Sequence, residues 1–509
     1  MIDPSLAGRP SPRSGAGPDR IEIETCLRIM AQAREADPAD PRWESVREAA
    51  AQLYRAGKKA RKAARHADRR RRDHEATAAT ARYREQDPSP ASVRPAISTG
   101  RPDPAGASEA DPSIGRSDQA GRLLVGTRRC YVCKSVYRQV HQEYHLLCPE
   151  CAEENLARRH ARCDLRGRRA VVTGGRVKIG FQLALKLLRD GAEVLVTTRF
   201  PRDAARRFAA VPDAADWVER VHVHGVDLLD LAAVAGLLEA VHQRFTSLDI
   251  LVNNAAQTIR RPAAYHRGVR AAETEPLRGL AARVAVVDAP PARFDVPAPA
   301  SLAAPALEAV SGPGRVHAGE ATVATGRDVL EALFPADRTD ETGQPLDLRD
   351  RNSWSLRLHE VDAAEWLEVQ LVNSFAPFLL TSRLRGLLEA SPWPDRYVVQ
   401  VSAMEGSFSR EHKTVRHPHT NMAKAALNML TRTAAADYAA SGIHMTSVDT
   451  GWVTDERPHP DKTAQREAGF RPPLDVIDGA ARVYDPIVRG VGGERVSGLF
   501  LKDYRPVDW

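Results

Sequence analysis

Apolar and polar positions change their spacing several times along the chain. Residues 1–20 are rich in Pro, Gly and Ser and contain no apolar run, so we expect a disordered tail without a secretory signal. Residues 21–85 follow helical spacing with a proline-containing break at residues 37–41, which predicts two helices. Residues 86–122 have no periodicity and predict a linker.

The remaining chain carries a different pattern. A short module at residues 123–163 contains four cysteines, and after it short apolar runs alternate with helical stretches over residues 164–509. This alternation predicts an α/β fold, a doubly wound parallel sheet of the Rossmann type. Residues 257–351 are rich in Ala, Pro and Arg without a clear sheet pattern, so we expect an insertion there. Short helices are expected within it at residues 304–310 and 329–334.

The first apolar run of the α/β region leads into a glycine-containing turn. Arg169–Val172 predicts a buried strand and Phe181–Asp190 a helix, with Thr173–Gly180 between them. Gly174 allows a tight turn, and Gly180 lets the helix pack closely on the strand. Because unpaired N–H groups at a helix N-terminus attract anions, the turn predicts a dinucleotide site.

Three more strands are predicted, and polar residues mark the ends of two of them. The strands are expected at Glu193–Thr197, Val221–Gly225 and Leu248–Val252. Asp227-Leu228 comes after the second of these, and Asn253–Ala256 reads Asn-Asn-Ala-Ala after the third.

These segments together resemble the short-chain dehydrogenase/reductase family over about residues 164–256 and 352–509. The resemblance implies an oxidoreductase that moves a hydride between a nicotinamide cofactor and a small substrate, at a carbon–oxygen, carbon–carbon or carbon–nitrogen bond. The substrate itself cannot be deduced from the sequence. The resemblance also assigns the cofactor contacts to Thr173, Gly174, Arg176, Lys178, Ile179, Gly180, Thr198, Arg199, Asp227, Leu228, Asn254, Ala255, Lys424, Gly451, Val453 and Thr454.

The end of the second strand indicates which cofactor is preferred. An NAD site usually places Asp or Glu there to bond the ribose 2′-hydroxyl, whereas this chain reads Thr197-Thr198-Arg199. Arg199 with Thr198 can hold a 2′-phosphate through charge-assisted hydrogen bonds, and Arg176 and Lys178 add cations in the phosphate loop. The pattern favours NADP(H) over NAD(H); the alternative is that Arg199 is a solvated arginine at a strand end.

The reaction site departs from the family, whose members use Asn, Ser, Tyr and Lys. Asn373 and Lys424 match the family pattern. Thr420 stands four residues before Lys424, where the family has tyrosine, and Ser402 comes one residue before the place of the family serine, which Ala403 occupies. One helical turn puts Thr420 and Lys424 on one face, but a threonine hydroxyl is a far weaker acid than a phenol with a pKa of about 10.

Three hypotheses therefore stay open for the chemistry. In the first, a histidine of the extended loop, His412, His417 or His419, supplies the proton. His417 lies seven residues before Lys424, where the enoyl-reductase branch of the family carries its tyrosine. In the second, hydride goes to a carbon–carbon or carbon–nitrogen double bond and water or a ribose relay completes protonation. In the third, the domain binds nucleotide without turnover, as a sensor or scaffold that recruits a partner.

The four cysteines of the short module form two Cys-x-x-Cys pairs. Fourteen residues separate Cys130-x-x-Cys133 from Cys148-x-x-Cys151. This spacing predicts a structural Zn²⁺ ribbon with four thiolate ligands and no open coordination position. A redox pair is disfavoured because it needs only one such motif, and His141 or His145 could replace a ligand but is not needed.

Charge is concentrated in one stretch. The formal net charge is +7, and residues 55–72 carry ten Lys and Arg residues against a single acid, Asp68. Such a basic arm suits nucleic acid, an acidic partner or a membrane surface, and a solvated charged helix is an equally good interpretation. No apolar run is long enough to span a bilayer, so we expect a cytoplasmic protein, and we expect a homo-oligomer through the Rossmann domain.

Overall fold

The chain divides into two compact units, Met1–Glu75 and Ala76–Trp509. No helix in the described part of the chain combines the length and apolar content needed to cross a membrane. The computed structural model describes residues 17–86, 122–288, 332–335, 338–340, 342–411 and 413–509.

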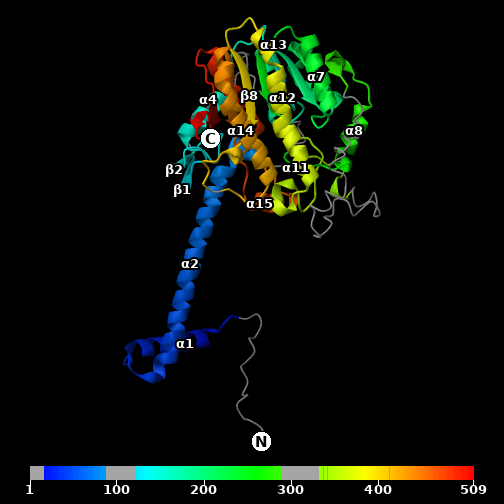
Figure 1. The fold of residues 1–509 in the computed structure, drawn as a ribbon. Coiled ribbons are helices and arrows are strands. Elements are labelled where there is room, and N and C mark those ends of the chain that lie inside the picture. The colour runs from blue at the N-terminus through cyan, green and yellow to red at the C-terminus, as the bar shows by residue number, and fades with distance from the viewer. Residues whose placement is uncertain (1–16, 87–121, 289–331, 336–337, 341, 412) are drawn as a thin grey trace, which may run out of the picture. The chain divides into compact units, whose positions relative to one another are not determined.

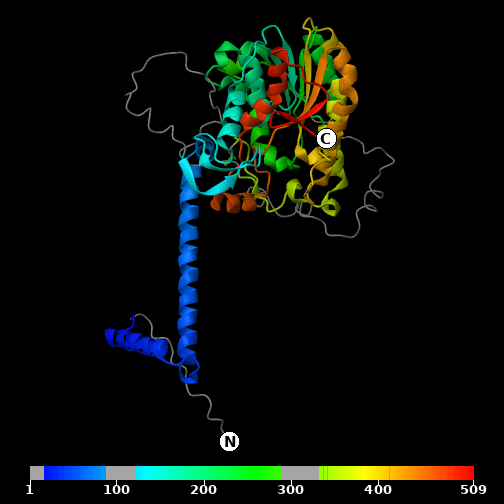
Figure 2. The ribbon, with the colours of Figure 1, turned by 90° about the vertical axis from the view of Figure 1, so that its left-hand side faces the viewer.

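The first unit contains two helices, α1 (Arg20–Glu35) and α2 (Glu44–Ala78), which continues into the second unit. Asp19 begins α1 with a capping box, because its side chain accepts from the Glu22 N–H at 2.8 Å while Glu22 accepts from the Asp19 N–H at 3.0 Å. Between the helices the chain makes a short 3₁₀ turn at Pro41–Trp43. The prediction of two helices with a proline-rich break is confirmed (Figure 2).

In the second unit, the end of α2 is followed by α3 (Ala81–Glu85) and a small module. Strands β1 (Arg122–Arg129) and β2 (Val136–Val140) pair antiparallel, and helix α4 (Pro149–His160) follows them. Its small core contains Cys130, Cys148 and Cys151.

The main sheet has the strand order β11-β10-β9-β8-β6-β3-β4-β5-β7. Neighbouring strands run parallel except β10 and β11, which form an antiparallel pair. The predicted α/β doubly wound sheet is thus confirmed (Figure 1). The strands are β3 (Arg169–Val172), β4 (Glu193–Thr198), β5 (Val221–Gly225), β6 (Ile250–Asn253), β7 (Ala285–Val287), β8 (Arg396–Ser402), β9 (Ile443–Asp449), β10 (Leu499–Lys502) and β11 (Arg505–Val507).

Helices cover both faces of this sheet because successive strand residues point to opposite sides. Ala170 and Val172 of β3 belong to one apolar core, and Val171 between them belongs to the other. The first face is covered by α5 (Lys178–Arg189), α6 (Pro201–Ala209) and α16 (Val476–Val491). The second is covered by α7 (Leu231–Arg244), α12 (Ala376–Arg383), α13 (Arg385–Glu389) and α14 (Pro418–Ala440), with α11 (Ala363–Gln370) packed against α14.

The insertion at residues 257–351 contributes a strand that its sequence pattern did not predict. Ala285–Val287 forms β7 and pairs parallel with β5, so it covers the free edge of that strand. Helix α8 (Arg267–Glu273) lies before it. The helix expected at residues 304–310 and most of the helix expected at residues 329–334 lie outside the described residues.

Candidate functional site

The carboxyl ends of the parallel strands bring together the turn after β3, the chain after β6 and the start of α14. In the turn after β3, Gly174 has a φ of +70°, and a Cβ there would lie 2.9 Å from the Ala255 Cα. At Gly180 a Cβ would lie 2.3 Å from the Gly174 carbonyl oxygen. These contacts are with backbone, so both positions accept only glycine in this geometry. The turn leaves the N-terminal end of α5 facing the sheet edge.

Asn254 holds the turn from the side of β6. Its Nδ2 donates to the carbonyl oxygens of Thr173 at 2.9 Å and Gly174 at 3.1 Å. The Thr173 hydroxyl oxygen accepts from the N–H groups of Asn254 and Ala255, both at 3.0 Å. Asp227, after β5, accepts the Leu229 N–H at 3.1 Å and so fixes its own turn. The structure thus brings together Thr173, Gly174, Asn254 and Ala255, four of the residues assigned by resemblance.

Two cations of this turn have acidic partners that the sequence did not predict. Arg176 donates to the Asp203 carboxylate at 2.6 Å, and its side chain is 10% exposed. Lys178, whose φ is +54°, donates to Glu456 at 3.0 Å. Burial tends to raise the pKa of Glu456, but the nearby Lys178 charge outweighs it and lowers the value to about 2. The formal charge of the turn is therefore largely compensated.

Cations gather at the end of β4. Arg199 is exposed, its guanidinium lies 5.7 Å from the centre of the Phe200 ring, and no acid pairs with it among the described residues. Beside it, His266 is 5% exposed and its Nε2 has no hydrogen-bond partner within the described chain. Burial, with the charges of Arg199, Arg176, Arg270 and Arg261, lowers the pKa of His266 to about 3. His266 comes from the insertion, so its position could not be read from the family pattern.

Asn373 and Lys424 occupy the interior of the site. Asn373 lies in a π-helical turn (Leu371–Phe375). Its side chain makes two hydrogen bonds to the backbone of Gln257: it accepts from the N–H at 2.6 Å and donates to the carbonyl oxygen at 3.0 Å. Lys424 donates to the Val401 carbonyl at 2.7 Å. Burial lowers the pKa of Lys424 from its usual value of 10.5 to about 8.

Ser402 and Thr420 differ in what their hydroxyl groups contact. The Ser402 hydroxyl donates to Asn428 Oδ1 at 2.6 Å, which ties β8 to α14. The Thr420 hydroxyl is buried and has no hydrogen-bond partner in the described chain. The Ser402 hydroxyl is therefore engaged by α14, whereas the buried Thr420 hydroxyl has no partner among the described residues.

The loop histidines lie in different surroundings. His417 stacks on Trp354 with ring centres 3.8 Å apart and an angle of 9°, and its Nδ1 lies 3.0 Å from Asn421 Oδ1. His419 is fully buried, with its Nε2 at 3.5 Å from Glu365 of α11. His412 lies outside the described residues.

His417 also lines a cavity of about 470 Å³. The cavity lies between the 3₁₀ turn Ser353–Ser355, the loop before α14 and the start of α15 (His459–Glu467). Its lining residues are Trp354, Ser355, Thr414, Arg416, His417, Arg457, Pro458, Asp461, Ala464 and Gln465.

Asp449 is a titratable group that the sequence analysis missed. It ends β9, two residues before Gly451, and its Oδ2 lies 3.9 Å from Lys502 Nζ. Burial raises the pKa of Asp449 to about 6. The sequence could have pointed to Asp449, because it is a carboxylate at the end of a buried strand, where the carboxyl edge of the sheet lies. The turn that follows includes Thr454, whose hydroxyl donates to Glu456 at 2.8 Å.

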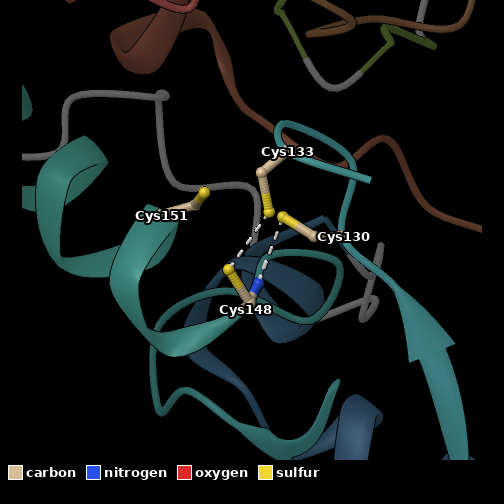
Figure 3. A group of neighbouring side chains, drawn as sticks. All are labelled: Cys130, Cys133, Cys148 and Cys151. Atoms are coloured by element: carbon tan, nitrogen blue, oxygen red, sulfur yellow. Dashed lines mark hydrogen bonds between the residues drawn. The ribbon is translucent and has the colours of Figure 1, made fainter. Parts of the chain in front are cut away.

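The four cysteines of the small module converge at one point, as Figure 3 shows. Their Sγ atoms all lie within 4.8 Å of one another, and no disulfide joins them. Tetrahedral Zn–S bonds of about 2.3 Å place sulfur atoms roughly 3.8 Å apart, so the cluster has the size that a zinc ion requires. His141 and His145 point elsewhere, to Glu153 and to the Arg471 carbonyl.

The module packs directly on the chain that follows β9. The Tyr131 hydroxyl oxygen accepts the Trp452 N–H at 2.9 Å, and Val453 and Leu474 join the core that contains the cysteines. Arg159 of α4 donates to Asp475 at 2.7 Å and to Asp478 at 2.8 Å. The small module thus supports the same turn whose Gly451, Val453 and Thr454 were assigned to the cofactor by resemblance.

Two family models and one long relative match the chain. Residues 168–271 match the model of short chain dehydrogenase, and residues 351–468 match that of Enoyl-(Acyl carrier protein) reductase. The protein named Uncharacterized protein R665 from Acanthamoeba polyphaga mimivirus is 32% identical over an alignment of 377 positions that covers 71% of each chain. The chain belongs to the short-chain dehydrogenase/reductase family.

Relatives named by activity match a shorter stretch. Carbonyl reductase [NADPH] 1 of Sus scrofa is 37% identical over 87 residues, 17% of this chain and 29% of its own length. The (+)-neomenthol dehydrogenase of Arabidopsis thaliana is 38% identical over 92 residues, 17% of this chain and 30% of its own length. The chain thus spans less than a third of the length of these two relatives.

Solved structures of similar topology include the NADPH-bound carbonyl reductase from chicken fatty liver. It has a TM-score of 0.40 and 17% identity, covering 68% of this chain and 100% of its own. A short chain dehydrogenase from Burkholderia cenocepacia in complex with NADP has a TM-score of 0.41 and 19% identity, covering 67% of this chain and 97% of its own.

Proposed function

We propose that the protein is an NADP(H)-dependent oxidoreductase whose small organic substrate occupies the cavity beside His417. The observation that carries this proposal is that a sterically locked dinucleotide turn and a buried lysine with a pKa of about 8 lie at the same sheet edge. Gly174, Gly180 and Asn254 would hold the cofactor phosphates over the N-terminus of α5, and Lys424 would bind the ribose.

The choice of NADP(H) rests on the charges at the end of β4. Arg199 is exposed without an acidic partner among the described residues, and no carboxylate ends the strand. The arginines around His266 add positive potential at the same place. A 2′-phosphate would neutralise this charge, whereas the 2′-hydroxyl of NAD(H) would leave it unpaired. Arg176 and Lys178 would contribute less than their charge suggests, because Asp203 and Glu456 compensate them.

For proton transfer, we assign the role to His417. It lines the cavity, whereas His419 is enclosed beside Glu365. Thr420 keeps the family position on α14 but is too weak an acid to replace a phenol. An imidazole can donate a proton during reduction of the substrate and accept one during oxidation, with hydride exchanged with the nicotinamide ring of the bound cofactor. A domain that binds nucleotide as a sensor without turnover is not favoured, since the similar proteins named by activity are oxidoreductases.

Titration of the purified protein with NADPH and NADH tests the cofactor assignment. We expect NADPH to bind more tightly, and Arg199→Ala to weaken NADPH by about 10- to 100-fold, since hydrogen bonds to charged groups contribute about 1.5–3 kcal/mol. NADH binding should be unchanged in this variant. Arg278→Ala, at another exposed arginine in the same unit, is the matched control and should alter neither affinity. Equal affinities for the two cofactors in the wild type would contradict the assignment.

We further propose that Cys130, Cys133, Cys148 and Cys151 hold one structural Zn²⁺. Four thiolates close the coordination shell, so the ion would stabilise the module and take no part in hydride transfer. Metal analysis should find about one zinc per chain, and Cys133→Ser should lose it and make the module sensitive to protease. Cys26→Ser is the control, because Cys26 is an exposed cysteine outside the cluster. A full zinc content in Cys133→Ser would exclude this ligand set.

A homo-oligomer through the Rossmann domain is proposed on the face formed by α11, α12 and α14. Large apolar side chains are exposed there by 36–54%, which is costly on a monomer surface. Sedimentation velocity of the purified chain measures this association directly. The residues concerned are Trp366, Phe375, Phe378, Met422 and Met429.

A further inference from the structure

The stretch Arg55–Arg72 of α2 has a use that the oxidoreductase site does not explain. It lies in one continuous helix, and every residue of the stretch except Gly57 is exposed. Ten of its residues are cationic and only Asp68 is acidic. Nothing in the proposed hydride chemistry requires this charge.

The cations are confined to one side of the helix. With successive residues turned by about 100°, nine of the ten fall within an arc of about 180°. Arg71 falls outside the arc, and it is ion-paired with Asp68 at 2.6 Å and Glu75 at 2.8 Å. Within the arc, Arg69 pairs with Asp73 at 3.7 Å, and the other members have no ion pair in the described chain. The nine are Arg55, Lys58, Lys59, Arg61, Lys62, Arg65, Arg69, Arg70 and Arg72.

The opposite side of the same stretch is lined by small residues. A helix that lies in a membrane surface needs bulky apolar side chains opposite its cations, and alanines offer too little area for that. They do keep the helix slim, about 10 Å across on that side, while the cations at the two edges of the arc, Lys59, Arg61, Arg70 and Arg72, flank it. The small residues are Ala56, Ala60, Ala63, Ala64 and Ala67.

We propose that Arg55–Arg72 is a binding arm for duplex DNA, which contacts the phosphates on both walls of the major groove. This groove is about 12 Å wide and admits an α-helix, whereas the major groove of duplex RNA is too narrow. The stretch is roughly 26 Å long, and duplex DNA presents one phosphate per about 1.7 Å of its axis. Since the contacts are with phosphates, binding is strongly salt-dependent and weakly dependent on base sequence.

The full-length protein and a labelled DNA duplex of roughly two helical turns test the proposal by fluorescence anisotropy. The test variant replaces the four flanking cations Lys59, Arg61, Arg70 and Arg72 together by Gln, a good helix former. Losing four phosphate contacts should lower the slope of log K against log salt by about 3.6 and raise the Kd at about 100 mM salt by roughly 100-fold or more. The matched control exchanges the cations at the same positions, as Lys59→Arg, Arg61→Lys, Arg70→Lys and Arg72→Lys, and should bind like the wild type.

Circular dichroism checks that the Gln variant keeps its helix, and cofactor titration checks that the Rossmann domain is intact. Unchanged DNA binding by this variant overturns the proposal, as does a wild-type protein that does not bind the duplex. If the wild-type protein sedimented with phosphatidylserine vesicles, the Gln variant did not, and neither bound DNA, the arm would be assigned to membranes instead. Two duplexes of unrelated sequence should bind alike; a strong preference for one overturns the phosphate-based account.

Discussion

The cofactor half and the reaction half of the site share one sheet edge but tolerate change differently. In the proposed cofactor half, a Cβ at Gly180 or Gly174 would lie 2.3–2.9 Å from backbone atoms, so no other residue fits in this geometry. In the proposed reaction half, the sequence comparison with the family predicts that Thr420 and Ala403 occupy the places of its tyrosine and serine. A proton donor has only to reach the substrate, and His417 lines the neighbouring cavity. In the cofactor half, close steric contacts require glycine at these positions. In the reaction half, the proton donor needs only a suitable pKa and a position from which it reaches the substrate.

The largest effect is expected from a side chain placed in the cofactor half. Gly180→Val puts a Cβ 2.3 Å from the Gly174 carbonyl oxygen and 2.4 Å from Asn254 Nδ2, so the turn must move and NADPH binding should be lost. Gly236→Ala is the matched control, because a Cβ there meets nothing within 4 Å. Calorimetric titration measures both. Normal NADPH affinity in Gly180→Val would show that the turn does not hold the cofactor.

The second largest effect is expected on turnover, from a substitution of His417 in the reaction half. His417→Gln should lower turnover by about 10²–10⁴-fold, the usual contribution of a positioned acid, and leave NADPH affinity unchanged. Steady-state rates of NADPH oxidation with carbonyl, imine and enone compounds, measured beside cofactor titration, separate the two. His359→Gln, at an exposed histidine, serves as the control. If Thr420→Val abolished turnover while His417→Gln retained it, proton transfer through Thr420 would replace our assignment to His417.

The smallest effect is a pH dependence. Burial lowers the pKa of His417 below its usual value of 6.5, so at neutral pH most molecules hold it unprotonated. Substrate reduction needs the protonated form, and its rate should rise as pH falls towards that pKa, by at most about tenfold per unit. Oxidation needs the neutral form and should lose rate only as pH falls through and below that pKa. His417→Gln should flatten both profiles, and unchanged profiles in this variant would point to another group, such as Asp449.

The structure also shows where sequence patterns carried information and where they did not. The strands around the glycine turn were predicted nearly residue by residue, because a buried parallel strand leaves an unbroken apolar run between turn residues. β7 was not predicted, since three residues at a sheet edge give too short a pattern. The ion pairs of Arg176 with Asp203 and of Lys178 with Glu456 were also invisible, because their members lie 27 and 278 positions apart along the chain.

By itself the sequence determined the α/β fold, the glycine turn and the two Cys-x-x-Cys motifs whose cysteines meet in one cluster, because each depends on local spacing or residue type. Only the tertiary structure decided which histidine lines the cavity. His417 and His419 are two residues apart and chemically alike, yet one stacks on Trp354 and the other is enclosed beside Glu365. Their difference comes from helices and turns that fold onto α14 from elsewhere in the chain, and local sequence does not encode that packing.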